Sequence, residues 1–311
     1  MLHIKNLDEG AEVFKALGSD LRIQILKLLL EHKEMNMNEI ASALGVTNGA
    51  LTSHIKKLSE TGLVTVLTER SGHGNQKLCR IGVDKLLVEI QHDGLEGEEN
   101  TVETEVPIGL YSAYSVYPTC GLSSTKKLVG VVDDPRCFAY PERIQAGILW
   151  FTRGYIEYNI PNLLPSGTQV DQLTLSVEIS SEAPGVNNDW PSDIAFYLND
   201  EKLGVWTSPG DFGDIRGIFT PGWWFPNWNQ YGLLKMIVIN RKGTFIDGLK
   251  ISDVSIDRFC LDYKSTIRFK FQVEEDARNA GGLTLFGTGF GNYNQDIKIR
   301  MRYRSGIPDS K

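Results

Sequence analysis

Apolar side chains recur at helical spacing near the start of the chain and at alternate positions in its second half. Leu21, Ile25, Leu28 and Leu29 form one apolar stripe over three helical turns, and Ser19 stands where a cap is expected. This pattern predicts a core helix. The alternating runs that dominate later predict strands, so the two ends of the chain differ in architecture.

Two further helices are expected directly after the first. Asn36 and Glu39 have the form of a capping box for a short helix over residues 37–44. Thr47 then caps a longer helix over residues 48–60, whose free face is polar. A short helix followed closely by such a polar helix is the helix-turn-helix arrangement, in which the second helix enters the major groove of DNA.

A hairpin is expected behind these helices. Residues 63–68 predict a strand, residues 69–75 a glycine-rich tip that carries Arg70 and His73, and residues 76–81 a returning strand. Such a hairpin is the wing of a winged helix-turn-helix domain. Between residues 46 and 81, five lysines and arginines face two acidic residues, so this segment forms a local positive patch.

The polar helix face and the wing supply the candidate DNA contacts. Amide and hydroxyl groups can reach base edges, whereas lysines and arginines suit phosphates. The alternative is a merely solvated helix face, which the flanking architecture disfavours. The candidates are Thr47, Asn48, Thr52, Ser53, His54, Lys56, Lys57, Arg70, His73 and Lys77.

Three runs within residues 7–82 resemble the arsenic-repressor (ArsR) type of winged helix. They cover residues 17–29, 38–45 and 53–64, and their joint spacing is more specific than any one of them. The resemblance implies a homodimer on a palindromic operator, with half-sites about one DNA turn apart. The Cys-x-Cys metal pattern of that family is replaced by residues 37–40, and no Asp-x-His pattern follows the wing. We therefore expect no metal and no cofactor.

Composition changes after about residue 100. Residues 1–92 hold 11 basic and 11 acidic residues, so the formal charge of −7 belongs to the remainder of the chain. All six Trp and all eleven Tyr lie beyond residue 110. We expect a DNA-binding domain over residues 1–92, a polar linker over 93–102 and a ligand-sensing domain over 103–311.

The second domain reads as short alternating runs separated by Gly, Pro, Asn and Asp. This texture is typical of an antiparallel β-sandwich of the jelly-roll kind, with two packed sheets. The fold class expected for the whole chain is α+β multidomain, a winged helix-turn-helix followed by that sandwich. The expected strands cover residues 172–180, 193–198, 234–239, 266–273, 282–286 and 296–303.

Loops rich in Trp lie between these strands, over residues 181–192, 206–214 and 219–232. Indole faces pack on the C–H faces of sugar rings, and carboxylates and amides pair with hydroxyl groups, so we expect a sugar or oligosaccharide ligand. The alternative is an aromatic cap that only packs over one end of the sandwich. The candidate ligand-binding residues are Trp190, Asp193, Trp206, Asp211, Trp223, Trp224, Trp228 and Asn229.

Two other classes of function compete with a sugar sensor. Glu182 with Asp189, or Asp211 with Asp214, could form the paired acids of a glycoside hydrolase. No nucleophile elbow, phosphate loop or HExxH helix accompanies them, and we expect no catalytic activity. A DNA-binding scaffold whose sandwich only oligomerises is the third class.

Location and partners follow from the remaining features. The N-terminus lacks a secretory pattern and no run of about 18 apolar residues occurs, so we expect a cytoplasmic protein without membrane contact. The expected partners are operator DNA, a small-molecule effector and a second copy of the chain. The effector would release or fix the repressor by changing the arrangement of its two reader domains. The cysteines are expected as free thiols: Cys79, Cys120, Cys137 and Cys260.

Overall fold

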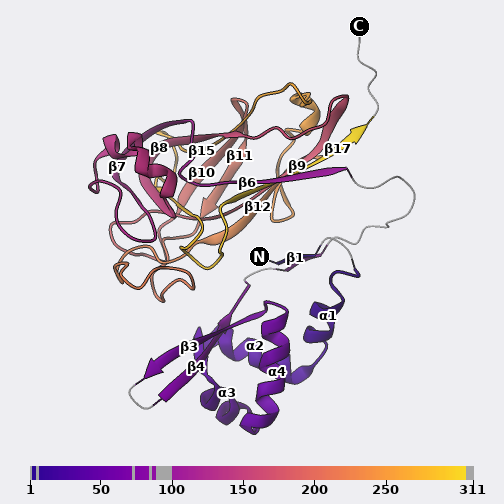
Figure 1. Ribbon diagram of the computed structural model, residues 1–311, viewed down its shortest axis with the longest axis vertical. Helices are drawn as coiled ribbons and strands as arrows, with labels where there is room; N and C mark the ends of the chain where they lie inside the picture. The colour runs from indigo at the N-terminus through magenta and orange to yellow at the C-terminus, as the bar shows by residue number, and fades with distance from the viewer. Residues whose placement is uncertain (1, 5–6, 72–73, 84–85, 89–99, 306–311) are drawn as a thin grey trace. The chain divides into compact units, whose positions relative to one another are not determined.

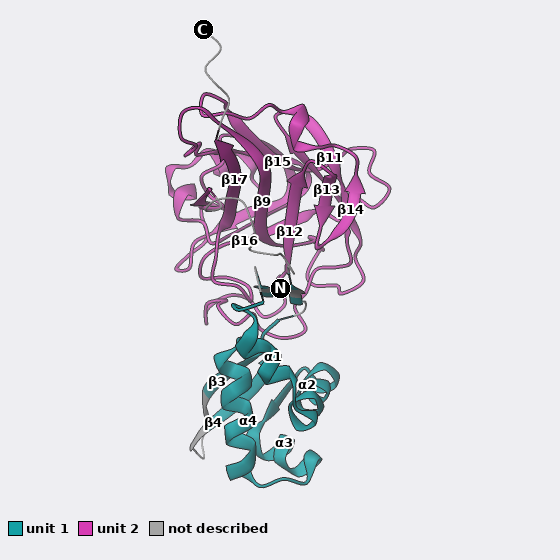
Figure 2. Ribbon diagram, turned by 90° about the vertical axis from the view of Figure 1, so that its right-hand side faces the viewer, with its two compact units in different colours: residues 1–95 teal, residues 96–311 magenta. Residues whose placement is uncertain are grey.

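The computed structural model divides into two compact units, residues 1–95 and 96–311 (Figure 2). Each unit has its own hydrophobic core and is described separately below. The residues that the structure describes are 2–4, 7–71, 74–83, 86–88 and 100–305.

The first unit is built from helices with a small sheet beside them (Figure 1). Helices α3 and α4 form the helix-turn-helix at the predicted bounds, and strands pair antiparallel in the order β2-β4-β3. Strands β1 and β5 pair in parallel. The elements are β1 (Leu2–Ile4), α1 (Ala11–Leu17), α2 (Asp20–His32), β2 (Glu34–Asn36), α3 (Met37–Leu44), α4 (Asn48–Glu60), β3 (Val64–Ser71), β4 (Gly74–Ile81) and β5 (Leu86–Val88).

Local hydrogen bonds explain why α3 begins and ends where it does. The Asn36 side chain accepts from the backbone N–H groups of Asn38 and Glu39 at 2.9 and 3.0 Å, and Glu39 Oε2 accepts from Asn36 N–H at 2.7 Å. The predicted capping box is therefore confirmed. Gly45 ends the helix at φ 65°, a left-handed conformation that glycine adopts without strain.

The wing differs from its predicted form. The ladder between β3 and β4 continues to Ser71 opposite Gly74, so the long tip predicted over residues 69–75 is wrong. Arg70 lies within β3, while His73 lies outside the described residues. Polar side chains in this run have low strand propensity, but cross-strand backbone pairing overrides that preference.

The second unit consists of strands with three short 3-10 helices. Every predicted strand is present, within two residues at most ends and four at the start of β9. Its elements are β6 (Thr101–Val106), β7 (Ala113–Ser123), η1 (Pro135–Ala139), η2 (Pro141–Gln145), β8 (Ile148–Ile160), β9 (Thr168–Ser180), β10 (Ser192–Leu198), β11 (Glu201–Ser208), β12 (Leu233–Asn240), β13 (Gly243–Ile246), β14 (Leu249–Ser252), η3 (Ile256–Arg258), β15 (Ile267–Val273), β16 (Leu283–Phe286) and β17 (Ile297–Ser305).

The strands of this unit form one antiparallel network that is nearly closed, which fits the predicted fold class. One half runs β11-β10-β15-β8 with β7 also on β8, and the other runs β14-β13-β12-β9 with β17 and β6 beyond it. The short strand β16 pairs with both β8 and β9 and so joins the halves. The two sheets that we expected are thus linked by hydrogen bonds rather than only packed.

Alternation along β8 separates two buried clusters. Leu149 and Phe151 point into the main core of the domain, whereas Ile148 and Trp150 join a smaller cluster with the buried ring of Trp224. Because successive strand side chains point to opposite faces, an apolar run buried on both faces shows no alternation in the sequence. Trp150 therefore packs against Trp224 and Trp228 of the aromatic loop over residues 219–232.

The predicted linker needs one correction. Most of residues 93–102 lies outside the described part of the chain, but Thr101 and Val102 already belong to β6. They pair there with Arg302 and Met301 of β17, so this end of the predicted linker belongs to an edge strand.

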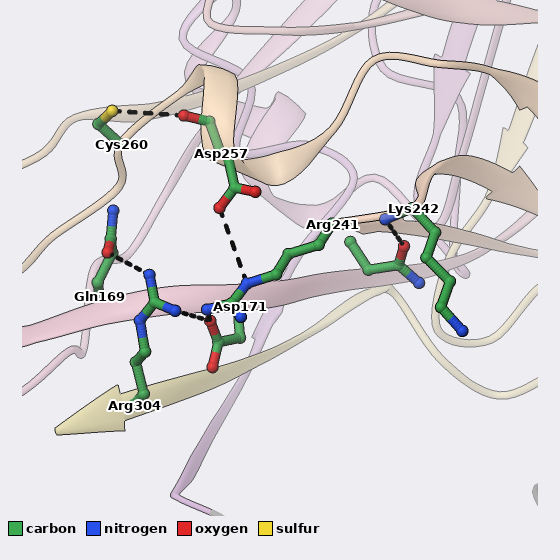
Figure 3. Close-up of polar contacts among 8 residues, drawn as sticks. Gln169, Asp171, Arg241, Lys242, Asp257, Cys260 and Arg304 are labelled. Carbon is green, nitrogen blue, oxygen red and sulfur yellow. Dashed lines mark hydrogen bonds and ion pairs between the residues drawn. The ribbon is translucent and has the colours of Figure 1, made fainter.

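Ion pairs on the surface connect β9, β17 and the segment after β12 (Figure 3). Asp171 accepts from Arg241 at 2.6 Å and lies 3.5 Å from Arg304, which also donates to Gln169 at 2.8 Å. Arg241 also lies 3.8 Å from Asp257. Such exposed pairs contribute about 0–1 kcal/mol each, so they fix local geometry more than stability.

No helix in the described ranges is long and apolar enough to cross a membrane. Cys79, Cys120 and Cys137 are buried free thiols, and Cys260 is an exposed one.

Candidate functional sites

The free face of α4 exposes most of the predicted DNA contacts. Thr47 caps the helix by accepting from Ala50 N–H at 3.3 Å. Asn48 donates to Asn38 Oδ1 at 2.7 Å and so ties the start of α4 to α3. The exposed candidates on or next to α4 are Thr47, Asn48, Thr52, Ser53, Lys56 and Lys57.

The hydroxyl groups on this face have a defined orientation. Thr52 donates to Asn48 O at 2.7 Å and Ser53 donates to Ala50 O at 2.9 Å. Their hydroxyl protons are therefore used within the helix, and their oxygens remain able to accept from base amino groups. Lys56 lies 3.7 Å from Glu60 in an exposed pair that a phosphate can replace.

His54 has a different position from the other candidates. It is half-buried, and its Nδ1 lies 3.5 Å from the guanidinium of Arg22. That guanidinium donates to Lys15 O at 2.6 Å and to Ala16 O, which are carbonyls at the end of α1. The contact fixes α4 against α1 and α2, so the geometry favours a positioning role for His54 over direct base contact.

The wing candidates are described only in part. Lys77 is exposed on β4, opposite Thr68. The backbone of Arg70 lies in β3, but its side chain, like His73, lies outside what the structure describes.

A pocket of about 160 Å³ opens at one end of the sheet domain. Its floor is formed by the buried residues Trp150, Glu182, Ala183 and Asn229. Half-buried Thr119 and Trp228 line its sides, and the rim is the exposed set Val132, Asp133, Pro184 and Gly185. Two indoles thus meet carboxylate and amide groups in one small cavity.

Glu182 occupies the centre of the polar network beneath this pocket. Its carboxyl accepts from Thr119 Oγ1 at 3.1 Å, Asn229 Nδ2 at 3.0 Å and Thr284 Oγ1 at 3.2 Å. Burial raises the pKa of Glu182 well above its usual range, and the charge of Asp211 adds to that rise. The hydrogen bonds from the two threonines oppose it.

Asp211 is the second buried carboxyl of this region. It is fully buried, and burial raises its pKa to about 7 although Ala183 N–H donates to Oδ2 at 3.0 Å. Its Oδ1 has no hydrogen-bond partner among the described residues. Asp211 lies behind the pocket wall and does not line the pocket.

The sequence left two roles open for the aromatic loop, ligand binding and core packing, and different residues of the loop take each role. Trp224 is 4% exposed, donates to Asn229 O at 2.9 Å and packs edge-on against Trp150 at 5.9 Å, so it belongs to the core. Trp228 lies 5.7 Å from Trp150 in a T-shaped pair and lines the pocket. Of the eight predicted ligand-binding residues, the structure brings only Trp228 and Asn229 to the pocket wall.

The remaining candidates lie elsewhere. Trp190 donates to Glu182 O at 3.1 Å and Trp223 to Thr125 O at 2.7 Å, and both rings are partly exposed outside the pocket. Trp206 packs on the main core with Lys235 over its ring at 4.6 Å. Asp193 is held by Thr207 and Asn279. The indoles of Trp190 and Trp223 are thus each held by a separate backbone carbonyl and do not converge on one cavity.

Sequence reasoning missed the pocket residues that come from strands and from distant loops. Trp150 was hidden in a continuous apolar run, and Thr119 and Asp133 carry no local signal. The sequence pairs Glu182 only with Asp189, as the acids of a hydrolase, and Asp189 is exposed. In the structure, the carboxyl that acts on Glu182 is instead Asp211, whose charge raises the pKa of Glu182.

Residues 19–66 match the family model for bacterial regulatory proteins of the arsR family. The match covers α2, the helix-turn-helix and the start of β3. The chain carries an ArsR-family helix-turn-helix domain. Its N-terminal unit is therefore that of a DNA-binding transcriptional regulator of ArsR type. The comparison with curated proteins found no match.

Several solved structures are similar to about a quarter of this ArsR-type chain. HlyU from Vibrio cholerae is 27% identical over 24% of this chain and 76% of its own, with a TM-score of 0.21. A homodimeric winged helix-turn-helix DNA-binding domain from Mycobacterium bovis is 34% identical over 24% and 66%, with a TM-score of 0.22. NolR from Sinorhizobium fredii is 27% identical over 24% and 70%, with a TM-score of 0.21.

Among the described residues, no group of three or more His, Cys, Asp or Glu side chains is placed to hold a metal ion.

The buried carboxyls predict how stability depends on pH. Asp211 has an ordinary pKa of 3.8 and a folded pKa of about 7, so the folded domain keeps a proton that the unfolded chain releases. The contribution of Asp211 to stability is therefore greatest below about pH 4 and falls as pH rises toward 7, by up to about 1.4 kcal/mol per pH unit. Asp211→Asn should reduce this fall, which thermal unfolding of the full chain at pH 5, 6 and 7 measures.

A matched control is available in the same region. Asp189→Asn alters an exposed carboxyl and should leave the pH dependence of the wild type unchanged. An Asp211→Asn variant with the same pH dependence as the wild type would contradict the role given to burial.

Proposed function

We propose that the protein is a transcriptional repressor whose sheet domain senses a sugar or oligosaccharide. DNA binding rests on the ArsR-family domain and its exposed polar face on α4. The sugar ligand rests on one observation, the convergence of Trp150, Trp228, Glu182 and Asn229 on a single cavity. Indole faces with carboxylate and amide partners suit a ring that is apolar on one face and hydroxylated at its edge.

The size of the pocket limits the part of a sugar that enters it. Its volume of about 160 Å³ is below the roughly 300–1,000 Å³ of pockets for drug-sized ligands. A single sugar ring fits the pocket volume best, either as a monosaccharide or as the end residue of an oligosaccharide. The exposed rim at Asp133 and Gly185 would let a longer chain extend into solvent.

We further propose a homodimer that acts in the cytoplasm on a two-fold operator. The similar Mycobacterium bovis domain is homodimeric, and two reader domains would occupy half-sites about one DNA turn apart. A ligand changes DNA affinity only if it binds the two arrangements of the dimer unequally.

We propose a sensor and not an enzyme. Of the four carboxyls that could form hydrolytic pairs, only Glu182 lines the pocket, while Asp189 and Asp214 are exposed and Asp211 lies behind the wall. Tyr231 also donates to Asp214 at 2.6 Å. Neither predicted pair therefore shares the cavity, and the second carboxyl that does line it, Asp133, accepts from Cys120 N–H at the rim.

The DNA-binding face predicts two different mutational effects. Lys57→Ala should weaken binding to all sequences and lower the slope of log K against log salt by about 1, because a phosphate contact is lost. Thr52→Ala should instead change sequence preference by about 1–3 kcal/mol at one base pair. Titration of full-length protein against a panel of duplexes at several salt concentrations measures both.

Asp20→Asn on α2 serves as the control for surface charge in the same unit. Unchanged affinity and unchanged preference in both α4 variants would exclude this contact surface.

The pocket predicts sugar-dependent release of DNA. At least one sugar of a plant-derived panel should release operator DNA from the wild type, and Trp228→Ala should weaken that sugar's binding at least tenfold by removing one aromatic wall. Calorimetry of the full chain measures sugar affinity, and thermal unfolding checks that the variant is folded.

Trp223→Ala is the matched control, because that ring lies outside the pocket. Equal losses in the two variants would refute the assignment of the pocket. Dimerisation without any sugar binding would favour the scaffold class, and release of hydrolysis products would favour an enzyme.

A further inference from the structure

The acidic side chains of the pocket indicate which charge the proposed sugar ligand carries. Among the described residues that line it, Glu182 and Asp133 carry carboxyl groups, and none is Lys, Arg or His. A neutral sugar ring can be bound by stacking and by hydroxyl hydrogen bonds alone. Two carboxyls with no lysine, arginine or histidine beside them instead favour a ligand that carries positive charge. This inference rests on the proposed sugar-binding function and adds the charge of the ligand.

The hydrogen-bond partners of Glu182 are all neutral. Oε1 accepts from the hydroxyl of Thr119, and Oε2 accepts from the amide of Asn229 and the hydroxyl of Thr284. These three donors orient the carboxyl but do not neutralise it. A buried carboxylate without a cationic partner is costly, so its ionised form is stabilised when a cation arrives.

The surroundings of Glu182 strengthen this preference. Asp211 is buried behind Ala183 and raises the pKa of Glu182, as does Asp133 at the rim. The nearby thiol of Cys120 stays protonated because burial raises its pKa to about 12. No lysine, arginine or histidine lines the described pocket beside Glu182, so no basic side chain in its lining offsets this effect.

Asp133 presents a second carboxyl at the mouth of the pocket. Its Oδ1 accepts from Cys120 N–H at 3.0 Å, and its backbone N–H donates to Cys120 O at 2.7 Å. These two bonds fix the residue at the rim, in the left-handed conformation at φ 62°. A ligand that enters passes this anchored carboxyl before it reaches Glu182.

The aromatic walls add to the selection of charge. Trp150 and Trp228 form a T-shaped pair with planes 68° apart, so they present differently oriented surfaces to the cavity. The negative face of an indole attracts a cation by about 0.5–2 kcal/mol, depending on desolvation. Aromatic rings and carboxyls without a basic residue form the combination that recognises ammonium groups.

We propose that this pocket selects a single-ring ligand that bears a protonated amino group, such as an amino sugar, with the ammonium paired to Glu182. The hydroxyl groups of the ring face Asn229 and the rim, and the ring packs on Trp228. Pairing ionises Glu182, so the carboxyl loses its proton to solvent as the ligand binds. Affinity therefore rises with pH while Glu182 of the free protein is still protonated, as long as the ligand amine also stays protonated.

Calorimetry of the full chain with three related sugars tests the proposal. At pH 6.5, glucosamine should bind at least tenfold more tightly than glucose or N-acetylglucosamine, because only glucosamine carries a charge. Its affinity should increase from pH 5.5 to 6.5, while the affinity of glucose should not.

Glu182→Gln should remove most of the preference for glucosamine. The glutamine oxygen can still accept from Asn229 and Thr284, and its amide can donate to the hydroxyl of Thr119, so the variant keeps the local hydrogen bonds. Asp189→Asn, an exposed change in the same loop, should keep the preference. If Glu182→Gln does not fold, Asp133→Asn at the rim should still reduce the preference several-fold.

The outcomes separate the two proposals. Glucose or N-acetylglucosamine binding as tightly as glucosamine would overturn the charge selection and leave the sugar sensor intact. Cyclohexylamine binding as tightly as glucosamine would support the ammonium site and overturn the sugar class. Failure of all four probes to bind would overturn both.

Discussion

Burial of the Glu182 carboxyl is the constraint on which the site of the sheet domain depends. Only 7% of the residue is exposed, and the carboxyl joins Thr119 of β7, Asn229 of the aromatic loop and Thr284 of β16. These segments are far apart in the sequence, and Glu182 links their side chains where pairing of β7 and β16 with β8 brings the strands near one another. A well-packed apolar residue would stabilise such a position more than an unpaired carboxyl does. Retention of a destabilising group inside a cavity is typical of a binding site.

The helix-turn-helix was predictable because its signals are local. The Asn36 capping box, the Thr47 cap and the left-handed Gly45 each lie within a few residues of the helix end that they determine. The bounds of α3 and α4 were therefore predicted correctly. The wing tip was not, because pairing up to Ser71 depends on a partner strand and not on the polar residues of the run itself.

The pocket could not be predicted in the same way, because its wall is assembled from five separate parts of the chain. Trp150 reaches it only because alternation along β8 sends Leu149 to the main core and Trp150 to the opposite face. The Trp-rich loop did signal the correct end of the domain. Composition alone could not separate Trp224, which fills the core, from Trp228, which lines the cavity. That division follows from tertiary packing, because Trp224 packs against Trp150 and Phe290 whereas Trp228 borders the cavity.

For the proposed sensor, the small volume of the pocket also limits how strongly a bound ligand could act on DNA binding. At about 0.3 kcal/mol per non-hydrogen atom, a sugar ring of about a dozen atoms contributes about 4 kcal/mol, which corresponds to a Kd near 1 mM. Driving a two-state switch from 1:99 to 99:1 requires about 5.5 kcal/mol of differential binding. At this ligand efficiency, which is that of drug-sized ligands, a neutral ring falls short of this, whereas a close charge pair across an interface couples by about 1.5–7 kcal/mol. Pairing at Glu182 would thus turn weak sugar binding into a signal strong enough to move the DNA-binding domains.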